Sequence, residues 1–149
     1  MRNIFISLFL LISFNVSAQN DEERWVDSVF NSLTLEQRVG QLFNLRANDP
    51  NKDFNTYIDD YIERYNIGGV TFFRTDAEKL LTKANEWQAK SQTPMMIAID
   101  GEWGIGMRIN DGISYPYQMT LGAVTNDSLI AEMGRQIAEQ CTRIGINVN

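Results

Sequence analysis

One segment, Met95–Arg108, constrains the fold of this chain more than any other. An apolar run follows Pro94 and ends in the carboxylate of Asp100, and a glycine-rich stretch then carries a second carboxylate, an indole and a guanidinium. A buried parallel strand has this pattern when it delivers a polar side chain to its carboxyl end. Ligands bind at the carboxyl ends of the strands in open α/β sheets and in (β/α)8 barrels alike. Asp100 is therefore the first candidate for a functional residue.

The rest of the chain alternates between helical and strand patterns. Apolar residues recur at helical spacing in four segments, namely 22–33, 54–65, 76–90 and, starting at 126 or 127, up to 144. Four segments have the β-branched, aromatic or continuously apolar character of strands, namely 42–46, 67–73, 95–100 and 146–149. Thr34–Gln37 has the form of a capping box and predicts a short helix after the first one. The connection 113–123 is expected to pack through Tyr115, Tyr117, Met119 and Leu121.

This alternation predicts an α/β fold with parallel strands and right-handed crossovers. A closed (β/α)8 barrel takes about 250 residues. We therefore expect the chain to supply the N-terminal half of a (β/α)8 TIM barrel, incomplete because the last strand has no helix after it. An exposed edge on that strand would favour pairing with a missing half.

The first residues have the form of an export signal. Arg2 supplies a short basic region, Ile4–Phe14 is almost wholly apolar, and small residues stand at Val16–Ala18. We predict a signal peptide over 1–18, cleavage after Ala18 and a barrel segment over 19–149, so that the protein is exported, periplasmic or secreted. No stable membrane span is expected after cleavage, and an uncleaved N-terminal anchor is the alternative.

Composition narrows the function classes. The net charge is −6 and no stretch resembles a basic patch, which disfavours a nucleic-acid partner. Histidine is absent and Cys141 is the only cysteine, so a zinc site is improbable and we predict neither a metal nor a cofactor. Cys141 lies on the apolar face of the last helix, which favours a small buried hydrophobe over a reactive thiol.

Asp100 has three interpretations. It could cap the turn at the strand end, ligate a metal together with Glu102, or accept hydrogen bonds from sugar or other hydroxyls. We favour the third, because a charged acceptor binds about twice as strongly as a neutral one. Asp100 and Glu102 are poorly placed as the acid and base of a glycosidase, since i, i+2 side chains at a strand end project from the same side. Glu102 is expected to fix the loop instead.

Three other features of this segment remain open at this point. Trp103 could stack on the apolar face of a sugar or pack under the loop. Arg108 could be a surface cation or a fork-shaped donor to the same ligand as Asp100. The glycines do not fit a nucleotide-binding motif, and no lysine follows them, so a phosphate loop is disfavoured.

Taken in order, these motifs resemble the N-terminal part of glycoside hydrolase family 3, and within it the exported bacterial β-N-acetylhexosaminidases. The resemblance runs from about Trp25 to the end of the chain. Its motifs are Ile67–Phe73, Ile97–Gly104 with Arg108, Pro116 with Gln118–Ala123, and Gly145–Asn149.

The resemblance implies a retaining exo-glycosidase that needs no metal and removes terminal β-N-acetylglucosamine from glycans or cell-wall fragments. In that branch the residues corresponding to Asp100 and Arg108 bind the sugar before the cleaved bond. The nucleophilic aspartate and the proton-transferring histidine lie beyond the part of the barrel seen here, so we expect no catalytic residue in this chain and no activity from it alone. A β-glucosidase of the same family and a non-catalytic sugar-binding α/β module are the alternatives.

Overall fold

A computed structural model describes residues 20–47 and 54–149, and the predicted signal peptide lies outside this range. The chain divides into two compact units, 1–32 and 33–149. In the first unit the described element is helix α2 (Asp21–Ser32), which confirms the helix predicted at 22–33 and has no buried residue. No helix in the described part of the chain is both long and apolar enough to cross a membrane.

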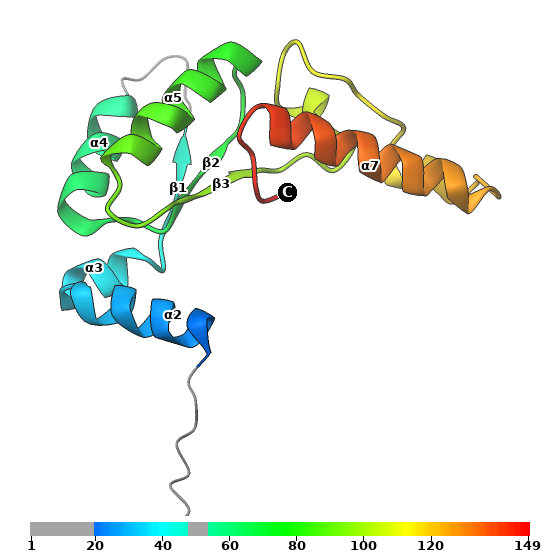
Figure 1. Cartoon of the computed structure of the whole chain (residues 1–149). Helices are drawn as coiled ribbons and strands as arrows, with labels where there is room; N and C mark the ends of the chain where they lie inside the picture. The colour runs from blue at the N-terminus through cyan, green and yellow to red at the C-terminus, as the bar shows by residue number, and fades with distance from the viewer. Residues whose placement is uncertain (1–19, 48–53) are drawn as a thin grey trace, which may run out of the picture. The chain divides into compact units, whose positions relative to one another are not determined.

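The second unit is built on three parallel strands. Its elements follow one another as α3 (Leu35–Gly40), β1 (Asn44–Ala47), α4 (Phe54–Tyr65), β2 (Gly69–Phe72), α5 (Ala77–Lys90), β3 (Met96–Ile99), the 3-10 turn η2 (Ile105–Met107), α6 (Gln118–Leu121) and α7 (Asp127–Arg143). The strands lie in the order β1-β2-β3, and helices connect them (Figure 1). The predicted α/β fold with parallel strands is therefore confirmed.

The last predicted strand forms only a bridge to β3. Val148 pairs with Ala98 in parallel, and the Ile99 N–H donates to the Val148 carbonyl at 3.0 Å. The side chain of Asn149 accepts a hydrogen bond from the Gly101 N–H at 2.9 Å. The segment after α7 thus lies beside β3 and supports the turn that follows Asp100.

Local chemistry sets the ends of the helices as the sequence predicts. The Thr34 hydroxyl accepts from the Gln37 N–H while the Gln37 side chain accepts from the Thr34 N–H, which is a complete capping box for α3. The Asn126 side chain accepts from the Ser128 N–H and caps α7. Gly145 follows α7 with a φ of +79°, a left-handed conformation that glycine adopts without steric cost.

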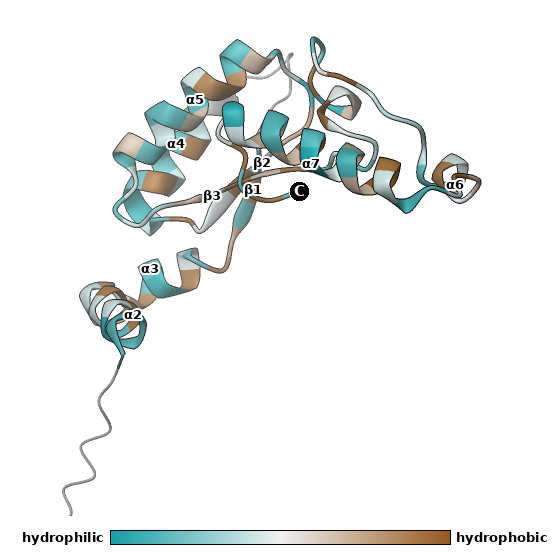
Figure 2. Ribbon diagram, turned by 45° about the vertical axis from the view of Figure 1, so that its right-hand side comes forward, coloured by the Kyte–Doolittle hydropathy of each residue, from teal (hydrophilic) through white to brown (hydrophobic). Residues whose placement is uncertain are grey.

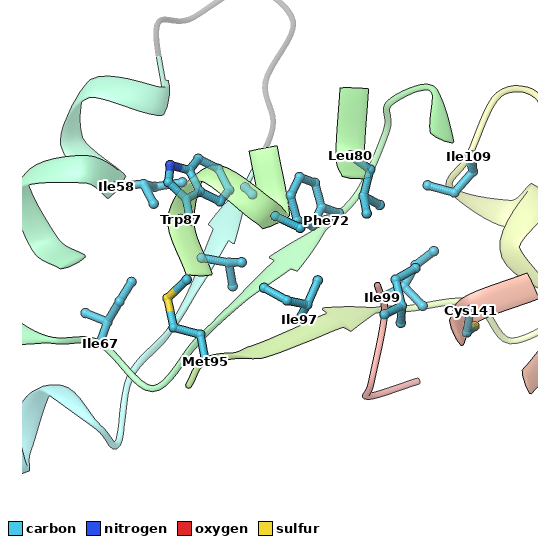
Figure 3. Packing of buried hydrophobic residues seen from close by; sticks show 14 of the residues in the cluster. Ile58, Ile67, Phe72, Leu80, Trp87, Met95, Ile97, Ile99, Ile109 and Cys141 are labelled. Atoms are coloured by element: carbon cyan, nitrogen blue, oxygen red, sulfur yellow. The ribbon is translucent and has the colours of Figure 1, made fainter. Parts of the chain in front are cut away.

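One face of the sheet packs against α4 and α5 and holds the core. Successive residues of a strand point to opposite faces, so Val70 and Phe72 of β2 share this face with Ile97 and Ile99 of β3. Trp87 of α5 stacks on Phe72, with ring centroids 5.7 Å apart (Figure 3). Strand β3 is hydrophobic along its length, while α4, α5 and α7 alternate hydrophobic and hydrophilic residues, which is the pattern of helices that cover a core on one side (Figure 2).

No helix of residues 54–149 covers the opposite face of the sheet, which carries polar residues (Figure 1). Arg46 on β1 is in register with Thr71 on β2 and Ala98 on β3. Asn44, two residues before Arg46 on β1, accepts a hydrogen bond from the Thr71 hydroxyl at 2.6 Å. We call this the helix-free face. It corresponds to the interior of a (β/α)8 barrel, where the inward side chains of neighbouring strands meet.

Two packing expectations were wrong. The helical spacing of 54–65 predicts that Tyr61 and Tyr65 lie on a buried stripe, but both are exposed, and Tyr61 contacts Tyr57 edge to face and Tyr65 at a tilt along the surface of α4. Met119 is 94% exposed and Tyr117 is also exposed, since part of the connection forms the short helix α6, which contains no buried residue. Helical periodicity alone does not show which apolar residues a neighbouring element covers.

Cys141 is buried, as its position on the apolar face of α7 predicts. Burial raises the pKa of its thiol, so little reactive thiolate forms near neutral pH. We expect a thiol reagent to label the folded protein at least about 100-fold more slowly than the denatured protein at pH 7.5. Equal labelling rates with and without denaturant would show that the thiol is accessible.

Candidate functional site

The strands β1, β2 and β3 bring three functional groups to one edge of the sheet. Arg46 stands one residue before the end of β1, Phe73 directly follows β2, and Asp100 directly follows β3. By the alternation along each strand, all three belong to the helix-free face. We refer to this edge, where the strands reach their carboxyl ends, as the rim.

Arg108 holds Asp100 through two contacts. Its Nε donates to the Asp100 backbone carbonyl at 3.0 Å, and a terminal guanidinium nitrogen donates to Oδ2 of the Asp100 carboxylate in an ion pair. The Arg108 side chain is only 20% exposed, whereas that of Asp100 is 43% exposed. No described residue donates to the other carboxylate oxygen, Oδ1. The carboxylate is therefore fixed in direction but keeps an oxygen available to a ligand.

The Phe73 ring joins the two arginines of the rim. The guanidinium carbon of Arg46 lies 4.4 Å from the ring centroid and that of Arg108 lies 5.0 Å from it. Cations within about 6 Å of an aromatic centroid are attracted by its electron-rich face. Sequence reasoning missed Phe73 and Arg46. The available signal was that the predicted strands end at these two residues, as the third ends at Asp100.

The glycines after Asp100 allow two pieces of backbone to approach closely. Gly104 has a φ of +92°, and a Cβ there would lie 2.7 Å from the Tyr115 ring. A Cβ on Gly106 would lie 2.4 Å from the Ser114 hydroxyl. Close packing of 104–106 against 112–115 thus accounts for both glycines without any phosphate ligand.

Trp103 and Glu102 lie on the same loop but differ in their contacts. The half-buried Trp103 ring meets Tyr117 edge to face, with centroids 4.6 Å apart and planes at 86°. Glu102 is exposed, and it is its backbone carbonyl that accepts a hydrogen bond, from Gln118. The loop is thus fastened at Glu102 by the backbone, whereas the Glu102 side chain forms no hydrogen bond or ion pair with another described residue.

The segment that carries Arg108 is fastened to the start of α5. The Thr75 N–H donates to the Arg108 carbonyl at 3.2 Å, and the Asn110 N–H donates to the Thr75 carbonyl at 2.9 Å. The Asn110 amide also donates to the Asp76 carboxylate at 2.9 Å. This hydrogen bond, followed by that from Lys79, holds the pKa of Asp76 below its usual range. The backbone around Arg108 is therefore anchored on residues 75 and 76, which lie between β2 and α5.

Asp111, which is not part of α5, caps the N-terminus of α5. Asp76 occupies the N-cap position of α5 without a capping bond from its own side chain, and Asp111 Oδ1 accepts from the Ala77 N–H at 3.0 Å instead. Replacing Asp111 with alanine is expected to lower the free energy of unfolding by about 1 kcal/mol, the usual effect of losing a cap. Urea unfolding measures this, and Asp111→Asn, which keeps the acceptor oxygen, should retain most of the stability. Equal losses in both variants would contradict the capping role.

The rim does not have the form of a metal centre. No cluster of three or more Asp, Glu or Cys side chains suited to a metal ion occurs among residues 20–47 and 54–149. Asp100 forms an ion pair with the Arg108 guanidinium. The structure gives no hydrogen bond between Glu102 and Asp100. The geometry instead suits hydroxyl groups, which can donate to a fixed carboxylate and accept from a guanidinium.

Residues 34–149 match the family model described as the glycosyl hydrolase family 3 N terminal domain. The chain belongs to glycosyl hydrolase family 3. This match covers every element from α3 onward, including the rim.

One named protein is similar to this family 3 chain in sequence, and two solved structures are similar to it in fold. A protein named beta-hexosaminidase A from Pseudoalteromonas piscicida is 33% identical over 105 residues, which are 62% of this chain and 18% of that protein. Among solved structures, beta-glucoside phosphorylase BglX bound to 2FGlc matches with a TM-score of 0.75 and 23% identity over 86% of this chain and 23% of its own. A second BglX structure matches with a TM-score of 0.71 and 21% identity. This family 3 chain thus spans less than a quarter of the length of these proteins.

Proposed function

We propose that this family 3 chain forms the sugar-binding part of the barrel of a retaining exo-glycosidase that removes terminal β-N-acetylglucosamine. The observation that carries the proposal is the Asp100–Arg108 pair at the rim, with one carboxylate oxygen left available. The 33% identity to a protein named beta-hexosaminidase A supports N-acetylglucosamine as the sugar. The substrate would be a glycan or a cell-wall fragment with this sugar at its non-reducing end.

In this proposal Asp100 orients the sugar and Arg108 positions Asp100. A carboxylate that accepts hydrogen bonds from two sugar hydroxyls fixes both the place and the rotation of a sugar ring. Fixing the ring lets the later bond-breaking steps proceed as effectively unimolecular reactions. Trp103, which is half-buried beside Tyr117 on the loop that follows Asp100, offers an apolar ring surface on which a sugar could stack.

The proposal assigns no catalytic residue to this chain. A retaining mechanism needs a nucleophilic carboxylate and a separate acid/base group on opposite sides of the scissile bond. Asp100 is held by Arg108, and the chain has no histidine. We propose that both catalytic groups lie in a part of the protein outside these 149 residues, so the chain alone would bind sugar without cleaving it.

An assay of the intact protein on two aryl glycosides tests the substrate. We expect release of the aryl group from the β-N-acetylglucosaminide and little from the β-glucoside. Faster release from the β-glucoside would support the β-glucosidase alternative. The structural likeness to a beta-glucoside phosphorylase is the reason to test this alternative. Binding of sugar with no turnover of either compound would support a non-catalytic sugar-binding module.

We also propose that the protein is exported. The basic, apolar and small-residue regions of 1–18 are the observation behind this proposal. N-terminal sequencing of the protein from its native cells should give Gln19 as the first residue. A protein that retains Met1 in the cytoplasm would contradict it.

A further inference from the structure

Arg46 is a cation of the rim that the proposed function does not use. It is exposed on the helix-free face of β1, and its guanidinium carbon lies 4.4 Å from the centroid of Phe73. The same ring carries the guanidinium of Arg108, at 5.0 Å. A group bound to Arg46 would therefore lie beside a ligand that Asp100 holds.

The charges of the two arginines are balanced differently. Arg108 forms an ion pair with Asp100, whereas no carboxylate in the described part of the chain lies within ion-pair distance of Arg46. Arg46 contacts a ring instead of an acid, although the chain as a whole is acidic, with a net charge of −6. General basicity of the protein thus does not explain a cation at this position that has no carboxylate partner among residues 20–47 and 54–149.

The contact with Phe73 prepares Arg46 to bind an anion. When a guanidinium lies over an aromatic ring, one face of the guanidinium plane is covered by the ring. The edge of the guanidinium, which carries the N–H groups, stays free. That edge carries parallel donors whose spacing matches the two oxygens of a carboxylate. The ring also restricts the side chain before the ligand arrives, so less conformational entropy is lost on binding.

We propose that Arg46 binds a carboxylate on the saccharide, and that the protein acts on acidic saccharides in preference to neutral ones. This inference rests on the proposed function, because it takes Asp100 as the residue that holds the sugar. It adds the substrate class, since a carboxylate such as that of a uronic acid would complement the positive charge of Arg46, which pairs with no carboxylate of residues 20–47 and 54–149.

A matched pair of substrates tests the inference in the intact protein. The first is a disaccharide of β-N-acetylglucosamine linked to glucuronic acid, and the second is its methyl ester, which has nearly the same shape without the charge. We expect kcat/KM to favour the acid about tenfold at low salt, the size of one hydrogen bond to a charged group. In Arg46→Gln the ratio of kcat/KM for the acid to kcat/KM for the ester should fall to about one. A general loss of activity would lower both values equally and would not affect this ratio.

Two further variants and one solution condition act as controls. Arg46→Lys keeps the charge and should retain part of the preference. Arg143→Gln removes the same charge from an exposed arginine at the end of α7, and it should leave the ratio as in the natural protein. Raising the salt concentration should weaken the preference of the natural protein, because exposed charges are screened. A ratio that stays at about ten in Arg46→Gln would overturn the inference.

Binding measurements separate this inference from the proposed function. Calorimetry with glucuronic acid and its methyl ester needs no turnover. If neither disaccharide is cleaved but the acid binds more tightly and Arg46→Gln abolishes the difference, the glycosidase proposal fails and the carboxylate site stands. If both disaccharides are cleaved with equal kcat/KM, the glycosidase proposal stands and the carboxylate site is refuted.

Discussion

Replacing Asp100 with alanine is expected to lower kcat/KM of the intact protein on its glycoside substrate at least about 100-fold. The change removes a charged acceptor that would bind two sugar hydroxyls, and each hydrogen bond to a charged group contributes about 1.5–3 kcal/mol. It also leaves Arg108, whose side chain is only 20% exposed, without its ionic partner. A loss of about 3 kcal/mol corresponds to roughly a hundredfold change. Steady-state kinetics on an aryl glycoside measures it.

Two comparisons make the Asp100 result specific. Asp100→Asn keeps the shape and one acceptor oxygen, so it should lose about tenfold, less than the alanine variant. Asp60→Ala removes an aspartate that also pairs with an arginine, Arg64, but on the exposed surface of α4, and it should change kcat/KM by less than about twofold. Normal turnover in a folded Asp100→Ala protein would refute the proposed grip on the sugar.

Replacing Trp87 with alanine is expected to lower the free energy of unfolding by about 3–5 kcal/mol, the usual cost of emptying a large aromatic site. Trp87 is 1% exposed and stacks on Phe72 beneath the sheet. Its indole N–H also donates to the Asp59 carboxylate at 3.1 Å, and this acceptor would lose that partner. Since domains are stable by only about 5–15 kcal/mol, the loss is a large share of the total. Thermal and urea unfolding measure it.

The matched variant for Trp87 is phenylalanine. Trp87→Phe keeps a ring against Phe72 and removes the hydrogen bond to Asp59, whose carboxylate still accepts from Lys90 at 2.7 Å. Its loss should therefore be about 1–2 kcal/mol. If alanine and phenylalanine destabilise the protein equally, the hydrogen bond and not the packing dominates at this position.

The sequence predicts the main elements of the fold because their signals are local. The capping box at Thr34, the β-branched run before Phe73 and the glycine after α7 each act through the backbone within a few residues, and the structure places a helix or strand end at each. The exposure of Met119 could not be predicted in this way. Burial depends on which element lies opposite, and that is a property of the tertiary arrangement.

The residues of the site also fall into those with a local sequence signal and those whose contacts depend on the tertiary fold. Asp100 and Arg108 could be singled out because a strand end and a cation eight residues later are visible in the sequence, and the structure brings them into contact. Arg46 and Phe73 come from different strands, so their contact depends on the register of β1 and β2. The role of Asp111 at the start of α5 likewise needs the tertiary fold, since 34 residues separate it from Ala77.

The short stretch of chain between Asp100 and Arg108 also bears on how the protein is made. Loops of about ten residues close in roughly 10–100 ns, whereas a ribosome adds about 5–20 residues per second. The carboxylate can thus meet its guanidinium long before translation delivers any segment that follows α7. Once β3 and the segment around Thr75 are folded, this short separation lets Asp100 and Arg108 find one another faster than partners that come from distant parts of the chain.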